Sequence, residues 1–149
     1  MNNPNTQLKD LIHVERGIIP ANLCDYIVDS IEKNEWRPHS WYNAAANTFG
    51  SEETMELDVQ NITPEHQQLL TPFMIQAGAS YNAKYHFECE RTMQIMNKFS
   101  AIRFNRYSPG QIMRQHHDHI HSLFDGQEKG IPVLSFILNL NDDYEGADL

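Results

Sequence analysis

The sequence has only two cysteines, Cys24 and Cys89, and it has no C-x-x-C pair. This excludes the ligand spacing of a zinc finger and the framework of a disulfide-rich secreted domain. In a reducing compartment, an isolated cysteine usually packs as a small apolar side chain. We therefore expect both cysteines to be buried and to have no redox role.

Basic residues are also scarce. Eleven lysines and arginines stand against twenty aspartates and glutamates, which gives a net charge of −9, and no basic run occurs along the chain. Proteins that bind nucleic acid draw much of their affinity from Lys and Arg contacts to phosphate, and anionic membrane surfaces attract basic segments in the same way. The charge balance therefore argues against nucleic acid and membrane surfaces as partners.

Long apolar runs are absent as well. Stretches such as residues 133–140 are far shorter than the roughly 20 apolar residues that a membrane-spanning helix needs. Residues 1–10 are polar and lack the apolar core of a signal peptide. From these two absences we expect a cytoplasmic protein.

The rest of the composition is that of an ordinary globular domain, with 40% hydrophobic, 10% aromatic and 21% charged residues. A chain of 149 residues is short for two domains. A chain of this size can still bury about 70% of the surface that it exposes when unfolded. We therefore expect one domain over residues 1–149 with one hydrophobic core.

Two segments have the apolar spacing of amphipathic helices. Apolar side chains recur at intervals of three and four residues after Pro20, which predicts a helix over residues 21–33. A second helix is predicted over residues 64–85, because Thr63 can cap its N-terminus and Pro64 fits the first helical position.

Strand patterns dominate the second half of the chain. Residues 93–107 are rich in β-forming side chains, and Ile102 and Phe104 alternate with their neighbours. A short strand is also predicted over residues 11–14, and strand fragments and loops over residues 36–51. Helices first and strands second indicate an α+β protein in which helices cover one face of a largely antiparallel sheet.

The most unusual segment is residues 115–121, which contain four of the eight histidines. In a strand, side chains alternate, so that His116 and Asp118 share one face. The opposite face would carry His117, His119 and His121. An imidazole beside a carboxylate supplies two ligands of the facial 2-His-1-carboxylate iron site. The alternatives are an exposed polar stretch near a turn, or a zinc or nickel site formed by the three histidines of the second face.

The residues around the histidine cluster follow a recognisable order. Tyr107 and Gly110 form a Tyr-x-x-Gly motif, His116 begins a His-x-Asp motif nine residues after the tyrosine, and residues 140–146 contain Leu-Asn-Asp followed by Glu-Gly. In this order and spacing, residues 100–149 resemble the iron(II)- and 2-oxoglutarate-dependent dioxygenases, specifically the prolyl 4-hydroxylase-like branch that includes the PKHD-type hydroxylases.

The resemblance implies a fold and a set of cofactors. The fold would be a double-stranded β-helix, or jelly-roll, over residues 93–149, supported by helices within residues 1–92. Fe(II) would be held by His116 and Asp118, which are the residues expected to be catalytic. The cosubstrate would be 2-oxoglutarate, with ascorbate as a further cofactor.

Three further residues are candidates for the cosubstrate pocket. Tyr107 corresponds to the motif tyrosine that lines this pocket in similar enzymes. Arg103 shares its face of the predicted strand and has the charge to meet a carboxylate. Asn139 lies on the mixed face of the apolar segment 133–140, which suits a pocket lining. The alternatives are a core aromatic for Tyr107 and solvated side chains for Arg103 and Asn139.

Similar enzymes take a third iron ligand from a histidine several tens of residues beyond the His-x-Asp motif, and a following Arg or Lys pairs with the cosubstrate. Between Asp118 and Leu149, the histidines are His119 and His121, which are too close to the motif along the strand, and the basic residue is Lys129, in a predicted loop. Neither element is therefore present. We therefore expect a jelly-roll that is incomplete at the C-terminus, activity that needs residues beyond 149, and a homo-oligomer formed through the open sheet edge.

Two functions follow from these observations. The first is a hydroxylase that acts on a prolyl or other peptide or amino-acid C–H bond, with residues 48–56 as a candidate lid over the substrate. The second is a catalytically inactive jelly-roll binding module that binds metal weakly through the histidine cluster. Metal binding by such a module would favour zinc or nickel and would not respond to 2-oxoglutarate.

Overall fold

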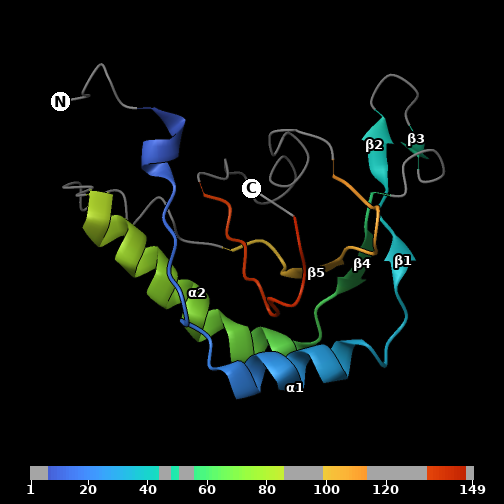
Figure 1. Ribbon diagram of the computed structural model, residues 1–149, viewed down its shortest axis with the longest axis horizontal. Coiled ribbons are helices and arrows are strands. Elements are labelled where there is room, and N and C mark those ends of the chain that lie inside the picture. The colour runs from blue at the N-terminus through green and yellow to red at the C-terminus, as the bar shows by residue number, and fades with distance from the viewer. Residues whose placement is uncertain (1–6, 44–47, 51–55, 86–98, 114–133, 147–149) are drawn as a thin grey trace, which may run out of the picture.

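The computed structural model describes residues 7–43, 48–50, 56–85, 99–113 and 134–146 (Figure 1). The elements in chain order are η1 (Leu8–Leu11), α1 (Ala21–Ile31), β1 (Arg37–Pro38), β2 (Trp41–Asn43), β3 (Thr48–Gly50), β4 (Asp58–Asn61), α2 (Pro64–Tyr85) and β5 (Arg103–Arg106). The strands form a three-stranded antiparallel sheet in the order β1-β4-β5 and an antiparallel pair, β2-β3. These described residues show no double-stranded β-helix, which stays a prediction.

Both helices lie where the apolar spacing predicts them. α1 begins at Ala21 and ends at Ile31, two residues before the predicted end, and α2 has the predicted bounds. The predicted cap is also present, because the His66 N–H donates a hydrogen bond to the Thr63 Oγ1 at 3.2 Å. No helix in the described part of the chain is long and apolar enough to cross a membrane.

The strand predicted over residues 11–14 is wrong. Leu11 ends the 3-10 helix η1, and the residues that follow run alongside α2 without joining a sheet. These residues contact side chains of α2 instead of a neighbouring strand. Tyr85 Oη donates a hydrogen bond to the Ile12 carbonyl at 3.0 Å, and His13 Nε2 lies 3.2 Å from Ser80 Oγ. The strand fragments predicted over residues 36–51 are confirmed as β1, β2 and β3.

The register of the three-stranded sheet gives it two distinct faces. Gln60 on β4 stands opposite Phe104 on β5, and Asp58 stands opposite Arg106. Residues directly opposite one another in an antiparallel pair share a face. This face turns toward the helices, since Gln60 Nε2 donates to the carbonyl of Ile31, the last residue of α1, at 3.2 Å.

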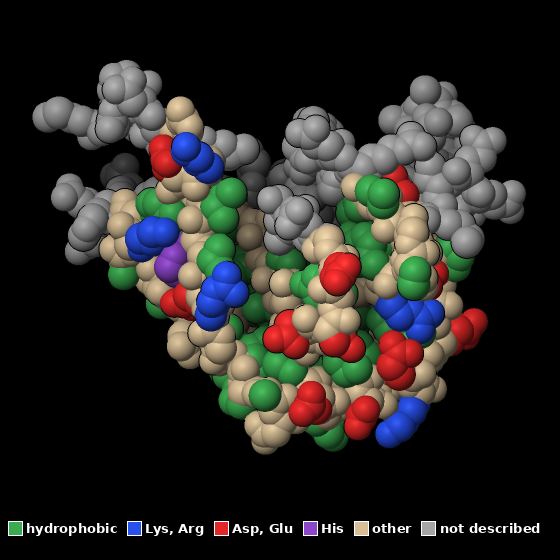
Figure 2. Space-filling model, in the orientation of Figure 1, with side chains coloured by type: hydrophobic (Ala, Val, Ile, Leu, Met, Phe, Trp, Pro, Cys, Tyr) green, Lys and Arg blue, Asp and Glu red, His purple; other side chains and the backbone are tan. Residues whose placement is uncertain are grey.

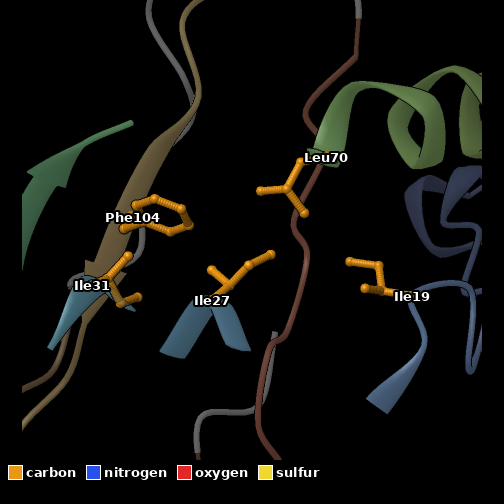
Figure 3. Packing of buried hydrophobic residues seen from close by; sticks show 5 residues of the cluster. All are labelled: Ile19, Ile27, Ile31, Leu70 and Phe104. Carbon is orange, nitrogen blue, oxygen red and sulfur yellow. The ribbon is translucent and has the colours of Figure 1, made fainter. Parts of the chain in front are cut away.

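The hydrophobic core lies between this face and the two helices. Five buried side chains from α1, α2, β5 and the segment before α1 form its centre and point toward one another in Figure 3; they are Ile19, Ile27, Ile31, Leu70 and Phe104. Leu138 and Leu140 pack against them. In residues 134–140, the side chains alternate between half-buried and exposed, which confirms that this segment turns its leucines toward the helices.

The second face of the sheet is also covered at its central strand. Val59 stands opposite Arg37 on one side and opposite Asn105 on the other, so it lies on the face away from the helices. Its side chain is 5% exposed, and Leu57, two residues earlier on the same face, is fully buried. β4 is therefore buried on both of its faces, as expected of the inner strand of a layered fold.

Candidate functional site

The candidate site lies on the face of β5 that turns away from the helices. Arg103 and Asn105 are exposed, whereas Phe104 between them is buried in the core. Tyr107 follows β5 directly and continues this alternation with an exposed side chain. The exposure of both Arg103 and Tyr107 is what the predicted sharing of one face would produce.

Tyr107 is 47% exposed, so it is not a core aromatic. Its hydroxyl donates a hydrogen bond to the Met113 Sδ at 3.6 Å. Partial burial raises the pKa of the Tyr107 phenol, the positive charge of Arg103 lowers it, and the negative charge of Glu56 raises it further. The phenol therefore stays protonated at neutral pH and remains a hydrogen-bond donor.

A turn follows Tyr107, as the Pro-Gly pair predicts. The Gln111 N–H donates to the Ser108 carbonyl at 2.9 Å, and the Gln111 side-chain oxygen accepts from the Ser108 N–H at 2.7 Å. Gly110 has φ +85°, a left-handed conformation that strongly favours glycine. The chain thus reverses direction immediately after Tyr107, on the way to the histidine-rich segment.

The remaining candidates are not all brought together. Arg103 Nε donates to the Asn105 Oδ1 at 2.9 Å, and its terminal nitrogens have no hydrogen-bond partner among the described residues. Asn139 is exposed, and its Nδ2 donates to the Tyr144 hydroxyl at 3.2 Å within its own segment. The structure therefore places Arg103 close enough to Tyr107 to affect its pKa, but it shows no such contact for Asn139.

The predicted iron ligands His116 and Asp118 lie outside the described residues, together with the other histidines of the cluster. Within the described part of the chain, no three His, Cys, Asp or Glu side chains are grouped closely enough to hold a metal ion. Of the candidate lid, residues 48–56, the structure describes β3 and Glu56, which is buried. Residues 51–55 lie outside the described residues.

Cys24 is partly buried against the core, in line with the role predicted for it. Burial is the main cause that raises the pKa of its thiol, and the neighbouring charge of Asp25 raises it further. A thiol with a raised pKa is a poor nucleophile, because the thiolate is the reactive form. Cys89 lies outside the described residues.

Sequence reasoning missed the buried histidine of α2. His66 is only 2% exposed, and its Nδ1 and Nε2 lie 3.1 Å from the Thr63 and Ser30 hydroxyls, respectively. Its ring meets Phe104 edge-on, with 5.4 Å between the centroids. Both ring nitrogens are thus engaged, and the side chain links α1, α2 and β5. Its position three residues after a capping threonine is the sequence signal for this role.

A second histidine forms a polar group that superficially resembles a catalytic triad. Ser80 Oγ lies 3.2 Å and Glu15 Oε1 lies 3.5 Å from His13 Nε2. In a serine nucleophile triad, the serine and the carboxylate contact different nitrogens of the imidazole. Here both contact the same nitrogen, so the group joins the N-terminal segment to α2 and does not activate Ser80.

No family model matches this chain, and comparisons with curated proteins and with solved structures give no significant match. A function can therefore be inferred only from the residues of the chain itself. Of these, Tyr107 and Arg103 on the outer face of β5 are the site residues that the structure describes together.

Proposed function

We propose that this protein is an iron(II)- and 2-oxoglutarate-dependent hydroxylase, similar to the prolyl 4-hydroxylase-like branch, that acts on a prolyl or other peptide or amino-acid C–H bond. The observation that carries the proposal is the position of Tyr107. The tyrosine follows β5 on the face away from the helices, and it is exposed just before the Gly110 turn. The sequence then continues to His116 and Asp118, the proposed iron ligands.

The described residues fit a cosubstrate that carries carboxylates. The protonated Tyr107 hydroxyl can donate a hydrogen bond to a carboxylate, and its observed acceptor, the Met113 thioether, is a weak one. Arg103 adds a positive charge on the same face. Bound iron and 2-oxoglutarate would supply the oxidising chemistry, while the chain orients the reactants and excludes water.

The burial of the sheet supports the proposed architecture. A jelly-roll consists of two sheets packed face to face, so a sheet that is also covered by helices is buried on both of its faces. Leu57 and Val59 are buried on the face of β4 away from the helices, whereas Gln60 and Phe104 are buried on the helical face. The site residues Arg103 and Tyr107 lie on the outer strand of this same non-helical face.

The test is an anaerobic titration with Fe(II), with and without 2-oxoglutarate, on the chain of 149 residues. We expect a visible charge-transfer band that requires both components, that is lost in His116→Ala and that persists in His117→Ala. The second variant is a matched control, because the neighbouring histidine lies on the other face of the predicted strand. We further expect Tyr107→Phe to weaken the dependence of the band on 2-oxoglutarate, because it removes the hydroxyl donor.

An unchanged band in His116→Ala would overturn the proposal. Absence of the band in the folded wild-type chain would mean that these 149 residues alone do not assemble the iron site. If the protein instead binds zinc or nickel more tightly than iron, and 2-oxoglutarate has no effect, the metal-binding module is the correct interpretation.

A further inference from the structure

Two arginines flank one asparagine on the face of the sheet away from the helices. Asn61 on β4 stands opposite Arg103 on β5. From the other side, Arg37 on β1 reaches Asn61, with its Nη2 donating to the Asn61 Oδ1 at 2.9 Å. Asn105, two residues along β5, accepts from the Arg103 Nε at 2.9 Å. All four side chains are exposed.

Neither of these arginines forms an ion pair within the described residues. Arg37 and Arg103 both donate to neutral carboxamide oxygens. Arg106, on the opposite face, lies within 3.2 Å of Glu32 and 3.1 Å of Asp58 and is therefore paired with two carboxylates. Among the described residues, the two guanidinium groups therefore have no carboxylate partner, and each has further N–H donors besides the one bonded to an amide.

The charge pattern of the molecule makes this pair distinctive. The net charge is −9, and in Figure 2 acidic side chains gather over α1 and the segment 134–146, which contribute Asp25, Asp29, Asp142, Asp143 and Glu145. On the face of the sheet away from the helices, no described residue of β1, β4 or β5 is acidic. A ligand with a negative group would therefore be attracted to this face and repelled by the acidic surface over α1 and the segment 134–146.

We propose that Arg37, Asn61, Arg103 and Asn105 form a site for an oxyanion, a carboxylate or phosphate group, carried by the peptide substrate. The assignment of the ligand as substrate rests on the proposed function. Guanidinium forks bind both kinds of oxyanion through paired hydrogen bonds, and the carboxamide N–H groups add further donors.

Arg103 precedes Tyr107 by four residues and lies close enough to it to affect the pKa of the phenol. The oxyanion site would therefore adjoin the position proposed for the cosubstrate, and it would select substrates by a charge outside the reacting residue.

The test measures peptide binding to the metal-free protein by calorimetry. Three proline-containing peptides are identical except at two positions. Both positions hold glutamate in the first peptide, phosphoserine in the second and glutamine in the third. We expect the wild-type protein to bind the glutamate or the phosphoserine peptide at least tenfold more tightly than the glutamine peptide, and added salt to reduce the difference. Whichever acidic peptide binds identifies the oxyanion.

Variants locate the binding. The double variant Arg37→Gln, Arg103→Gln should lose the preference for acidic peptides, while Lys33→Gln, which removes an exposed charge elsewhere, should keep it. Circular dichroism checks that both variants are folded. The proposal would be overturned if the wild-type protein bound the glutamine peptide as tightly as the acidic peptides. It would also be overturned if Lys33→Gln lost the preference for acidic peptides as fully as the double variant does. Because no iron is present, this result is independent of the titration that tests hydroxylase chemistry.

Discussion

Arg106 and Asp58 stand directly opposite one another on β5 and β4, and Arg106 Nη2 lies 3.1 Å from Asp58 Oδ2 on the helical face of the sheet. The same guanidinium lies 3.2 Å from Glu32, the residue that follows α1, and 4.4 Å from the centre of the Trp36 ring. One side chain thus connects the sheet to the end of α1 and to the connection that leads into β1.

Replacing Arg106 should loosen this junction. We expect Arg106→Gln to lower the free energy of unfolding by about 1–2 kcal/mol, because it removes two partly exposed ion pairs and one cation–π contact. Urea unfolding followed by tryptophan fluorescence measures the loss. Arg16→Gln, an exposed site outside the sheet, is the control and should change little. Equal stability of both variants would contradict the role of Arg106.

Leu57 reports on the covered second face of the sheet. Its side chain is fully buried, so Leu57→Ala should lower the free energy of unfolding by about 2–5 kcal/mol through lost burial and the remaining cavity. Leu11→Ala is the matched control, because Leu11 is 43% exposed and the same atoms are removed. A thermal or urea transition for each variant tests this, and a loss from Leu57→Ala no larger than the control would show that this face is open to water.

Thr63 serves both the start of α2 and the buried histidine. Thr63→Ala should lower the free energy of unfolding by about 1–2 kcal/mol, because it removes the cap on the His66 N–H and the hydroxyl beside His66 Nδ1. Thr63→Ser keeps the hydroxyl and should restore most of the loss. Urea unfolding compares the three proteins, and the cap assignment fails if serine is no better than alanine.

The titration of Tyr107 tests its position beside Arg103. We expect the pKa of the phenol to lie above its usual value of about 10, and Arg103→Gln to raise it further by removing a positive charge. NMR of ring-labelled tyrosine follows the titration, and Tyr107→Phe assigns the signal. An unchanged pKa in Arg103→Gln would place the arginine away from the phenol.

The raised pKa also has a consequence for stability. The folded protein holds the Tyr107 proton more tightly than the unfolded chain does. The contribution of this group to stability is therefore fully present below about pH 10 and is lost as the pH rises through the raised value. Wild-type protein should lose slightly more stability than Tyr107→Phe over this alkaline range.

Several features could be predicted because their causes are local. Thr63 and Pro64 mark the start of α2, which has the predicted bounds. The alternation around Phe104 predicts which side of β5 is buried, and Gly110 marks the turn. In each case, the necessary interactions involve residues within a few positions of one another, so the sequence pattern contains them.

The candidate site was only partly predictable. The sharing of one face by Arg103 and Tyr107 follows from strand alternation, but the link from Arg37 through Asn61 to this face needs the pairing of β1, β4 and β5. Strand register depends on chain segments far apart in sequence, and no local pattern specifies it. His116 and Asp118 remain predictions from the motif.

The sequence by itself determined the two helices, the cap at Thr63, the buried side of β5 and the turn after Tyr107, because hydrogen bonds and side-chain periodicity within short segments decide them. Tertiary structure alone decided that residues 11–14 run along α2 and that Leu57 is buried. These outcomes depend on which distant groups compete for the same backbone and apolar surface, and that competition is settled only when the chain packs.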